Sequence, residues 1–265
     1  MPDVLTKEVH LMDPIKTVTY NIRCVWKSDG EPGFASRGGL FYDKVLAERP
    51  DIIAFQEMIP QSLAYLRRVL PEYTFVGSGR CADYGGEGLY IAFRNDSCDL
   101  LGYDMFWMSP TPRVPASRFD GQSSCPRNIV EVIIRHKPSG KIVRYVSVHL
   151  DFTEEVQLTE AKCLLDILAE KQERYALPTV IMGDFNSLPD SEVTAYMHGD
   201  GRFGLRDVAK DIPVTYHEYG NDATKIDYIY VTGDIEADNV SAWTDKVCGI
   251  WLSDHYPICA ELTVK

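Results

Sequence analysis

Eight short apolar runs, rich in β-branched residues, recur through the sequence and constrain the fold more than any other feature. They lie at 16–20, 51–55, 88–93, 129–134, 142–150, 178–182, 226–231 and 257–262. Each run is bounded by Gly, Pro, Asp or Asn, which is typical of β-strands. Several of them are apolar at nearly every position, so we expect those strands to be covered on both faces of a sheet.

Three segments have the periodicity of helices. The clearest covers 153–175, where apolar residues form one stripe and charged residues occupy the other faces. Thr153, followed by two Glu residues, predicts a cap and an acidic first turn for this helix. Shorter helices are expected at 39–49 and 60–70, the second with Pro60 at its start.

The organisation of the chain favours one domain. Its 265 residues fit either one large domain or two small ones, and its 45% hydrophobic and 25% charged residues exclude wholesale disorder. We find no repeat, low-complexity tract or linker, so we predict a single domain over residues 1–265, with residues 1–14 as an N-terminal extension. Strands and helices interleave without the strict alternation of a βα-barrel, which favours a mixed-sheet α/β (α+β) sandwich with helices outside.

Charge and cysteine content restrict the partners and the compartment. The net charge of −12, from 27 basic and 39 acidic residues, gives no basic footprint for long nucleic acid. Seven scattered cysteines without a CxxC pair argue against a zinc cluster or a disulfide framework, so we expect small buried thiols in a reducing compartment. No signal peptide or membrane-spanning apolar run is recognisable. We therefore expect a cytoplasmic protein that does not bind membranes.

Six strand ends carry polar residues that a core strand does not need. These residues are Asn21 with Arg23, Gln56 with Glu57, His149 with Asp151, Asp184 with Asn186, Asp227, and Asp254 with His255. Residues i and i+2 of a strand share a face, so the pairs with this spacing are able to point into one cleft. Each has an ordinary alternative: an Asx turn at Asp184, a helix cap at Glu57, or a buried structural histidine at His149. Taken together, the six strand ends predict a shared site.

These residues, in this order, resemble the endonuclease/exonuclease/phosphatase superfamily from about residue 15 to residue 263. The most specific motifs are Gly-Asp-Phe-Asn at 183–186 and Ser-Asp-His at 253–255. The resemblance implies a four-layer α/β/β/α sandwich, in which two packed mixed β-sheets are flanked by helices and the site lies at one edge of the sheets. It is closest to a largely bacterial branch that has no settled substrate.

The resemblance also implies roles for individual residues. The implied catalytic residues are His149, Asp184, Asn186, Asp227 and His255. The implied metal ligands are Glu57, with Asn21 and Asp254 beside it, and the implied substrate contacts are Arg23, Arg127 and Asp151. The implied cofactor is Mg²⁺, with Mn²⁺ as a substitute. Asp184 would orient or deprotonate the attacking water, and His255, held by Asp227, would contact the phosphate.

One position departs from the repair nucleases of the superfamily, which have an acidic residue where this chain has Arg23. Replacing a carboxylate by a guanidinium removes a possible metal ligand, which favours a single cation. It also adds a group that binds phosphate or carboxylate through two parallel hydrogen bonds. Arg127 is either a second anion contact or an ordinary surface arginine, and Glu87 either lines the pocket or belongs to a glycine-rich turn. Loop aromatic residues either stack on a base or sugar or pack small loop cores; they are Trp26, Phe34, Trp107, Tyr216 and Trp251.

The favoured function is a metal-dependent phosphoesterase that acts on a small phosphorylated molecule or a short phosphodiester. The alternative is an endo- or exonuclease acting on DNA or RNA, which should lose activity steeply as salt rises. A binding module without turnover is a third possibility, and the complete set of acids, amides and imidazoles argues against it.

Overall fold

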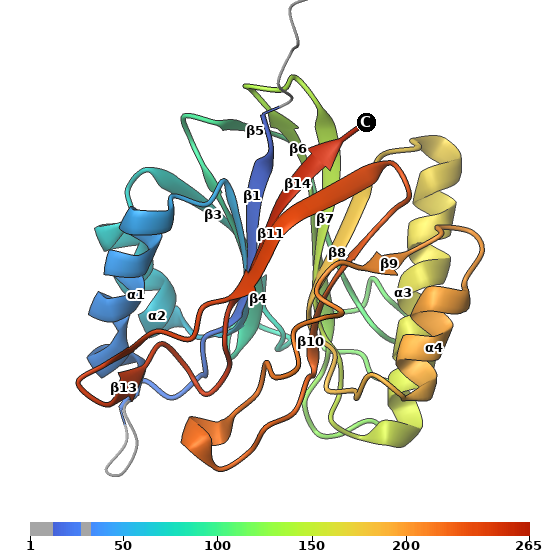
Figure 1. Ribbon diagram of the computed structural model, residues 1–265. Coiled ribbons are helices and arrows are strands. Elements are labelled where there is room, and N and C mark those ends of the chain that lie inside the picture. Colours follow the sequence, from blue (N-terminus) through green and yellow to red (C-terminus); the bar gives the residue numbers. More distant parts are fainter. Residues whose placement is uncertain (1–12, 28–32) are drawn as a thin grey trace, which may run out of the picture.

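The computed structural model describes residues 13–27 and 33–265, and within them two six-stranded β-sheets pack between two layers of helices (Figure 1). The helices are α1 (Phe34–Glu48), α2 (Pro60–Val69), α3 (Glu154–Arg174) and α4 (Glu192–Gly199), with a short 3-10 helix η1 (Glu218–Gly220). In Figure 1, α1 and α2 cover one side of the sandwich and α3 and α4 cover the other. The predicted four-layer α/β/β/α sandwich is confirmed. Residues 1–12 of the predicted N-terminal extension lie outside the described residues.

The first sheet has the strand order β11-β14-β1-β2-β4-β3. Its strands are β1 (Ile15–Asn21), β2 (Ile52–Met58), β3 (Tyr73–Gly79), β4 (Gly88–Arg94), β11 (Ile235–Ala242) and β14 (Ile258–Val264). Strands β1 and β2 are parallel, and every other neighbouring pair in this sheet is antiparallel. The parallel pair brings two carboxyl ends of strands together at one edge, where Asn21 lies opposite Gln56.

The second sheet repeats this plan with the order β5-β6-β7-β8-β10-β9. Its strands are β5 (Cys98–Trp107), β6 (Asn128–His136), β7 (Ile142–His149), β8 (Thr179–Asp184), β9 (Arg206–Asp207) and β10 (Asp227–Val231). Here β7 and β8 are the parallel pair, and His149 lies opposite Asp184. A separate small hairpin pairs β12 (Lys246–Val247) with β13 (Ile250–Trp251).

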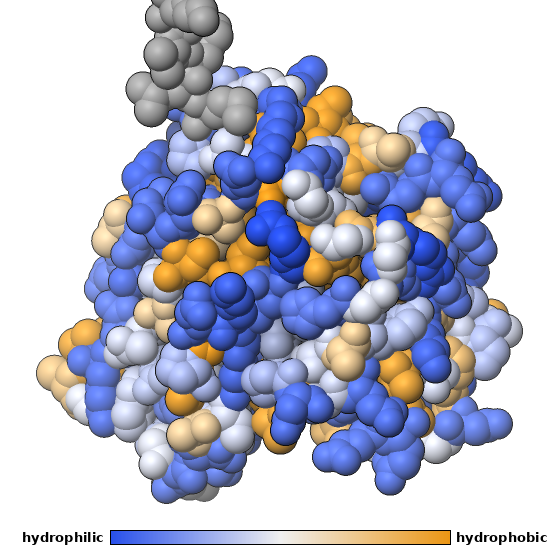
Figure 2. All heavy atoms as spheres, turned by 45° about the vertical axis from the view of Figure 1, so that its right-hand side comes forward, coloured by the Kyte–Doolittle hydropathy of each residue, from blue (hydrophilic) through white to orange (hydrophobic). Residues whose placement is uncertain are grey.

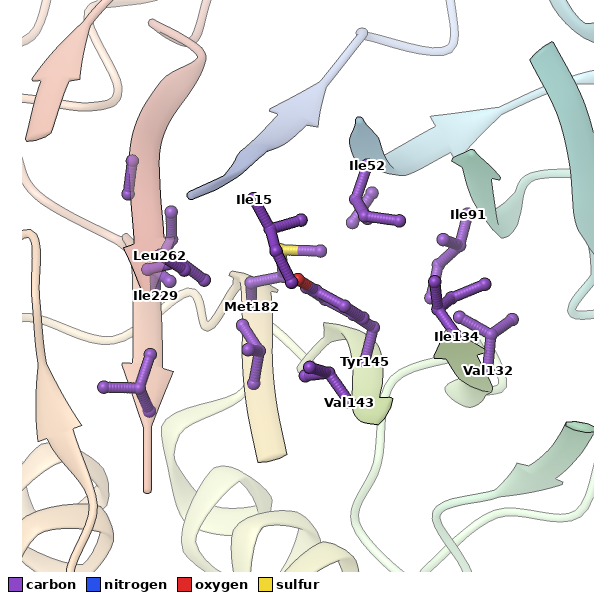
Figure 3. Close-up of a cluster of buried hydrophobic side chains, with 14 of the residues drawn as sticks. Ile15, Ile52, Ile91, Val132, Ile134, Val143, Tyr145, Met182, Ile229 and Leu262 are labelled. Atoms are coloured by element: carbon purple, nitrogen blue, oxygen red, sulfur yellow. The ribbon is translucent and has the colours of Figure 1, made fainter. Parts of the chain in front are cut away.

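Aliphatic side chains from both sheets meet in the space between them and form the central core (Figure 3). Ile52 and Ile91 come from the first sheet, and Val143 and Met182 come from the second. Because helices cover the outer faces of both sheets, the central strands are buried on both sides. In β2 every residue from Ile52 to Gln56 is buried, as expected for a strand without alternation.

A few polar contacts also link the two sheets. The Tyr145 hydroxyl of β7 lies 3.3 Å from the Thr17 hydroxyl of β1. Nearer the strand ends, Gln56 Nε2 donates to the Ser147 hydroxyl at 3.3 Å. All four side chains are fully buried. These bonds satisfy polar groups that would otherwise be costly inside an apolar core, and they join one sheet to the other.

All eight predicted strands are present, with ends that differ by a few residues. The predicted helix at 60–70 corresponds to α2, and the one at 153–175 corresponds to α3, although the Thr153 side chain makes no capping hydrogen bond within the described residues. Helix α1 begins five residues earlier than the predicted start at residue 39. Its first turn is stabilised by burial of Phe34, whereas the two glycines that follow weaken the helical signal in the sequence.

The expectation for the cysteines is partly wrong. All seven lie in the described part of the chain as free thiols, in agreement with the absence of a disulfide framework. Only Cys98 and Cys259 are buried, however, while Cys81 and Cys248 are exposed and the other three are half-buried. The thiols are therefore not simply small core residues.

The face in Figure 2 is mostly hydrophilic, and its hydrophobic areas are interrupted by hydrophilic side chains. Among the described residues, no helix combines the length and the apolar character needed to cross a bilayer.

Candidate active site

The polar strand ends come together at one end of the sandwich, away from the end at which the C-terminus lies (Figure 1). Asn21 is the last residue of β1, His149 of β7 and Asp184 of β8, while Asp227 begins β10 directly opposite Asp184. Glu57 is the residue before the last in β2. The first sheet thus contributes Asn21 and Glu57, and the second sheet contributes the remaining three.

The Asn21 amide connects the two groups. Its Nδ2 donates to Glu57 Oε1 at 3.1 Å and to Asp184 Oδ2 at 2.9 Å. Because one nitrogen reaches both acceptors, the carboxylates of Glu57 and Asp184 face a common space across the seam between the sheets. Its Oδ1 accepts the backbone N–H of Arg23 at 3.0 Å, which orients the amide.

Glu57 serves this site rather than the helix that follows it. Helix α2 has Ile59 at its N-cap position, and no side chain there makes a capping bond within the described residues. Glu57 Oε2 instead accepts the backbone N–H of Cys24 at 2.9 Å. Burial acts to raise the pKa of Glu57, but this N–H and the positive charge of His255 outweigh it and hold the pKa below its ordinary value. The carboxylate is therefore ionised.

The backbone around these residues is unusual. Glu57 and Arg23 both have φ 59°, a left-handed conformation that non-glycine residues rarely adopt. Asn186 has φ 48°, in the same region. Each such residue costs on the order of 1–3 kcal/mol, and conformations of this kind gather at functional sites.

Asp227 and His255 form a close pair in the site. His255 Nδ1 lies 2.8 Å from Asp227 Oδ2, which leaves Nε2 directed toward Asp184, 3.8 Å from its Oδ2. Burial alone would lower the pKa of His255, but the nearby carboxylates, Asp227 first, raise it to about 10. Burial raises the pKa of Asp184 to about 7, and repulsion from Asp227 adds to this effect. His255 is therefore a cation at neutral pH.

His149 has the opposite character. Its Nε2 lies 3.6 Å from Asp184 Oδ2, and the ring lines the cavity described below. Burial, together with the positive charges of Arg127 and Arg80, holds the pKa of His149 well below its ordinary value. The ring is thus neutral and offers one N–H donor.

Arg127 is not a surface residue. Its side chain is only 4% exposed, and its Nε lies 3.3 Å from Asp151 Oδ2. Its Nη1 has no hydrogen-bond partner among the described residues, although the side chain lines the cavity. Asp151 does not line that cavity; it accepts hydrogen bonds from Ser123 and from the Thr153 backbone N–H. Asp151 therefore supports Arg127, which differs from the substrate contact predicted for it.

The remaining predicted residues are divided between the cavity and its support. Arg23 lines the cavity, and its Nε lies 3.4 Å from Asp254 Oδ2. Asp254 is 1% exposed and does not line the cavity, so the structure pairs it with Arg23 rather than placing it beside Glu57. Asn186 lines the cavity and uses one amide hydrogen to bond the Leu150 carbonyl at 2.9 Å.

These side chains surround an open cavity of about 400 Å³. It is lined by Arg23, Cys24, Glu57, Arg80, Glu87, Cys125, Arg127, His149, Phe152, Asp184, Asn186, Tyr216, Ile226 and His255. Arg80, Cys24 and Phe152 belong to loops and turns next to strand ends, and sequence reasoning missed them because no periodic pattern marks such positions. Glu87 does line the cavity, where its carboxylate lies 2.6 Å from Arg80 Nη2.

Only one of the five predicted loop aromatic residues reaches the cavity, namely Tyr216. Its ring packs against His255 with a centroid separation of 4.9 Å. Phe34, at the start of α1, is buried in the core beside the first sheet, Trp107 is buried at the end of β5, and Trp26 packs with Phe34. The loop-core alternative therefore holds for most of these residues.

The residues present fit a divalent cation. The ionised carboxylate of Glu57 is a hard oxygen donor of the kind that Mg²⁺ prefers. Asn21 faces Glu57 with its amide nitrogen, while its Oδ1 accepts the Arg23 N–H, so Asn21 supports this carboxylate in the structure. Asp184, Asp227 and His255 each offer a ligand atom within 4.8 Å of the other two, which shows how closely the acidic groups gather.

Comparisons with known proteins agree with this arrangement. A sequence model described as the Endonuclease/Exonuclease/phosphatase family matches residues 18–255. No curated protein matches the chain.

Three solved structures illustrate the range of similar proteins. An endonuclease/exonuclease/phosphatase from Bacteroides vulgatus is 26% identical, with a TM-score of 0.87 over 95% of this chain and 99% of its own. A mannosyl-6-phosphatase from Bacteroides thetaiotaomicron is 24% identical, with a TM-score of 0.85 over 94% of this chain and 99% of its own. D. rerio TDP2, solved with a single-stranded DNA product, is 17% identical, with a TM-score of 0.72 over 95% and 99%.

Proposed function

The chain belongs to the endonuclease/exonuclease/phosphatase family, whose members are metal-dependent phosphoric ester hydrolases, and we propose that it is a Mg²⁺-dependent phosphatase of a small phosphorylated molecule. The observation that carries this proposal is the Asn21 amide, which donates to both Glu57 and Asp184. One carboxylate is thereby available to a cation, and the other is available to a water molecule on the far side of a phosphoryl group.

When bound by Glu57, whose carboxylate the Asn21 amide holds in place, Mg²⁺ would polarise the phosphoryl group and offset charge on the leaving oxygen. Asp184 orients the attacking water and accepts its proton, which its raised pKa favours. Asn186 has a second amide hydrogen to donate to a phosphoryl oxygen.

Positive and neutral donors act on the same phosphoryl oxygens. His255, kept cationic by Asp227, donates through Nε2 and offsets the negative charge of the transition state. The neutral His149 supplies one further N–H. Arg127 lines the cavity, and its Nη1, which has no partner among the described residues, would donate to a phosphoryl oxygen.

Charge and size support a small substrate. The net charge of −12 disfavours a long polyanion, and the cavity of about 400 Å³ suits a sugar phosphate or a molecule of similar size. Arg23, Arg80 and Arg127 bring three guanidinium groups to this cavity, each beside a carboxylate, and these groups are able to bind a phosphate. The likeness to a protein described as a mannosyl-6-phosphatase supports the same class of substrate.

A nuclease is the second candidate, and one observation favours it. Phe152 is 64% exposed at the cavity, where it is able to stack on a base. The likeness to TDP2 with a DNA product extends only to the fold. Cleavage of oligonucleotides should fall steeply as salt rises, because each phosphate contact releases counterions, whereas hydrolysis of a small phosphate ester should depend weakly on salt.

The test is a panel of phosphate mono- and diesters, including hexose 6-phosphates and short oligonucleotides, assayed with Mg²⁺ and with Mn²⁺. We expect hydrolysis of a small ester that EDTA and Glu57→Ala abolish, and a loss on the order of 10²–10⁴ in turnover for His255→Ala. Glu170→Ala, at an exposed position on α3, is the matched control. Preferential cleavage of oligonucleotides with a steep salt dependence would overturn the proposal in favour of the nuclease.

A further inference from the structure

Cys24 has a side chain for which the proposed hydrolysis has no use. Its Sγ and one carboxylate oxygen each of Glu57 and Glu87 lie within 4.8 Å of one another. All three residues are half-buried and line the cavity. A thiol thus lies between two carboxylates and is accessible from the cavity. The three side chains together offer one soft sulfur donor and two hard oxygen donors to the same ion.

The chain holds each of the three residues in place. The backbone N–H of Cys24 is fixed by its bond to Glu57 Oε2, which turns the thiol toward the same carboxylate. Glu87 lies where β3 and β4 close into a hairpin, and its carbonyl accepts the Arg80 backbone N–H at 2.9 Å. Gly88 is required there, because a Cβ at this position would lie 2.2 Å from the Ser78 carbonyl oxygen. The backbone that carries Cys24 and Glu87 is therefore fixed on both sides of Glu57.

We propose that Cys24, Glu57 and Glu87 form a binding site for a soft divalent cation such as Zn²⁺, which shares Glu57 with the oxygen site for Mg²⁺ but adds a thiolate. Two carboxylates and one thiolate supply three of the four ligands that Zn²⁺ takes, and water supplies the fourth. On binding, the thiol loses its proton to the solvent and the Zn–S bond forms, with no change of oxidation state.

Selectivity between the two cations follows from the sulfur. Thiolate ligands favour Zn²⁺ and similar soft ions, whereas Mg²⁺ binds oxygen donors. Because Glu57 belongs to both donor sets, Zn²⁺ and Mg²⁺ compete for it, and Zn²⁺ inhibits the enzyme. This competition rests on the proposed function, while binding of Zn²⁺ to the three residues does not.

The binding test uses the full-length, metal-free protein and does not depend on catalysis. Zn²⁺ affinity is measured by competition with a chelating dye for the parent chain, Cys24→Ser and Cys125→Ser. Cys125 is the matched control, because it lines the same cavity and is also half-buried but lies outside the cluster. Loss of a residue that only hydrogen-bonds to a metal ligand typically weakens metal binding by about 10–100-fold. Loss of the ligand itself in Cys24→Ser should therefore weaken Zn²⁺ binding by at least about tenfold. Cys125→Ser should bind Zn²⁺ as the parent does.

A spectroscopic measurement provides a second readout. Co²⁺ bound in place of Zn²⁺ should give a thiolate-to-metal charge-transfer band in the parent and in Cys125→Ser, and the band should be missing in Cys24→Ser. Glu87→Gln, which keeps the thiol, should retain the band and weaken Zn²⁺ binding. Unchanged Zn²⁺ affinity in Cys24→Ser, or equal losses in both cysteine variants, would overturn the proposal.

An activity assay distinguishes failure of the proposed Zn²⁺ site from failure of the proposed hydrolysis. In the parent, Zn²⁺ should inhibit hydrolysis competitively with Mg²⁺. If no phosphate ester is hydrolysed, the proposed function fails and the binding results still decide the Zn²⁺ site. Hydrolysis that Zn²⁺ supports as well as Mg²⁺ does would refute the competition.

Discussion

Asp227 acts on the chemistry through another residue, since it contacts His255 but does not line the cavity. Burial favours the neutral imidazole, and the neighbouring carboxylates reverse this preference and raise the pKa of His255 to about 10. The cation is therefore present below this value and is lost as the pH rises through it. Asp227→Asn should lower the pKa of His255, because the substitution removes the negative charge that stabilises the imidazolium against the effect of burial.

The expected result for Asp227→Asn is a shift of the alkaline limb of kcat/KM to lower pH, with turnover reduced at pH 8. A pH profile of kcat/KM at saturating Mg²⁺ measures both. An alkaline limb at the same pH as in the parent would mean that Asp227 does not set the charge of His255.

Glu160 illustrates a buried acid that lowers stability. It is fully buried; its Oε2 accepts the Asp151 backbone N–H, and its Oε1 has no partner in the described part of the chain. Burial raises the pKa of Glu160 to about 8. The folded chain thus binds a proton that the unfolded chain releases above about pH 4.3, so this residue costs stability as the pH rises from there toward 8.

Glu160→Gln should remove that cost. The free energy of unfolding of the variant, relative to the parent, should rise between pH 5 and pH 8 by up to about 1.4 kcal/mol per pH unit. Urea unfolding at several pH values measures the difference. A difference that does not change with pH would mean that Glu160 titrates normally.

At the scale of elements, β8 reaches the site only because a glycine precedes Asp184. Gly183 has φ 148°, and a Cβ there would lie 2.0 Å from the Val148 carbonyl oxygen of β7. Strands β7 and β8 would have to move apart, which would separate His149 from Asp184.

Gly183→Ala should therefore lower the free energy of unfolding by on the order of 3 kcal/mol through overpacking and backbone strain, and turnover should fall with it. Gly199→Ala is the matched control, because a Cβ at that position has open space around it. Thermal unfolding and initial rates of both variants test this. Equal stability of the two variants would show that β7 and β8 move apart at little cost in free energy.

The elements that sequence reasoning found are those whose burial is uniform. The central strands are buried along most of their length and were predicted, and the polar residues at or near their ends gave Glu57, Asp184 and His255. Strand β5 was missed because its middle alternates between exposed and half-buried residues, and β11 is largely exposed. Loop residues such as Arg80 and Cys24 reach the cavity through hairpin geometry, which leaves no pattern in the sequence.

At the scale of the molecule, the two sheets are separate hydrogen-bonded units that a core of aliphatic side chains holds together (Figure 3). The Tyr145–Thr17 contact is one of few polar bonds between them. Tyr145→Phe should lower the free energy of unfolding by about 1 kcal/mol, the usual net value of such a bond. A double-mutant cycle with Thr17→Val measures the coupling, and additive effects of the two changes would show that the contact contributes nothing.

The Asn21 amide donates a hydrogen bond to one carboxylate from each sheet. Both bonds can form only when the two sheets keep their relative position. A slide of one ångström between the halves would barely disturb an aliphatic interior, yet it would pull cation and water out of line with the phosphorus atom. Mild heating or dilute urea should therefore abolish hydrolysis before tryptophan fluorescence detects any unfolding.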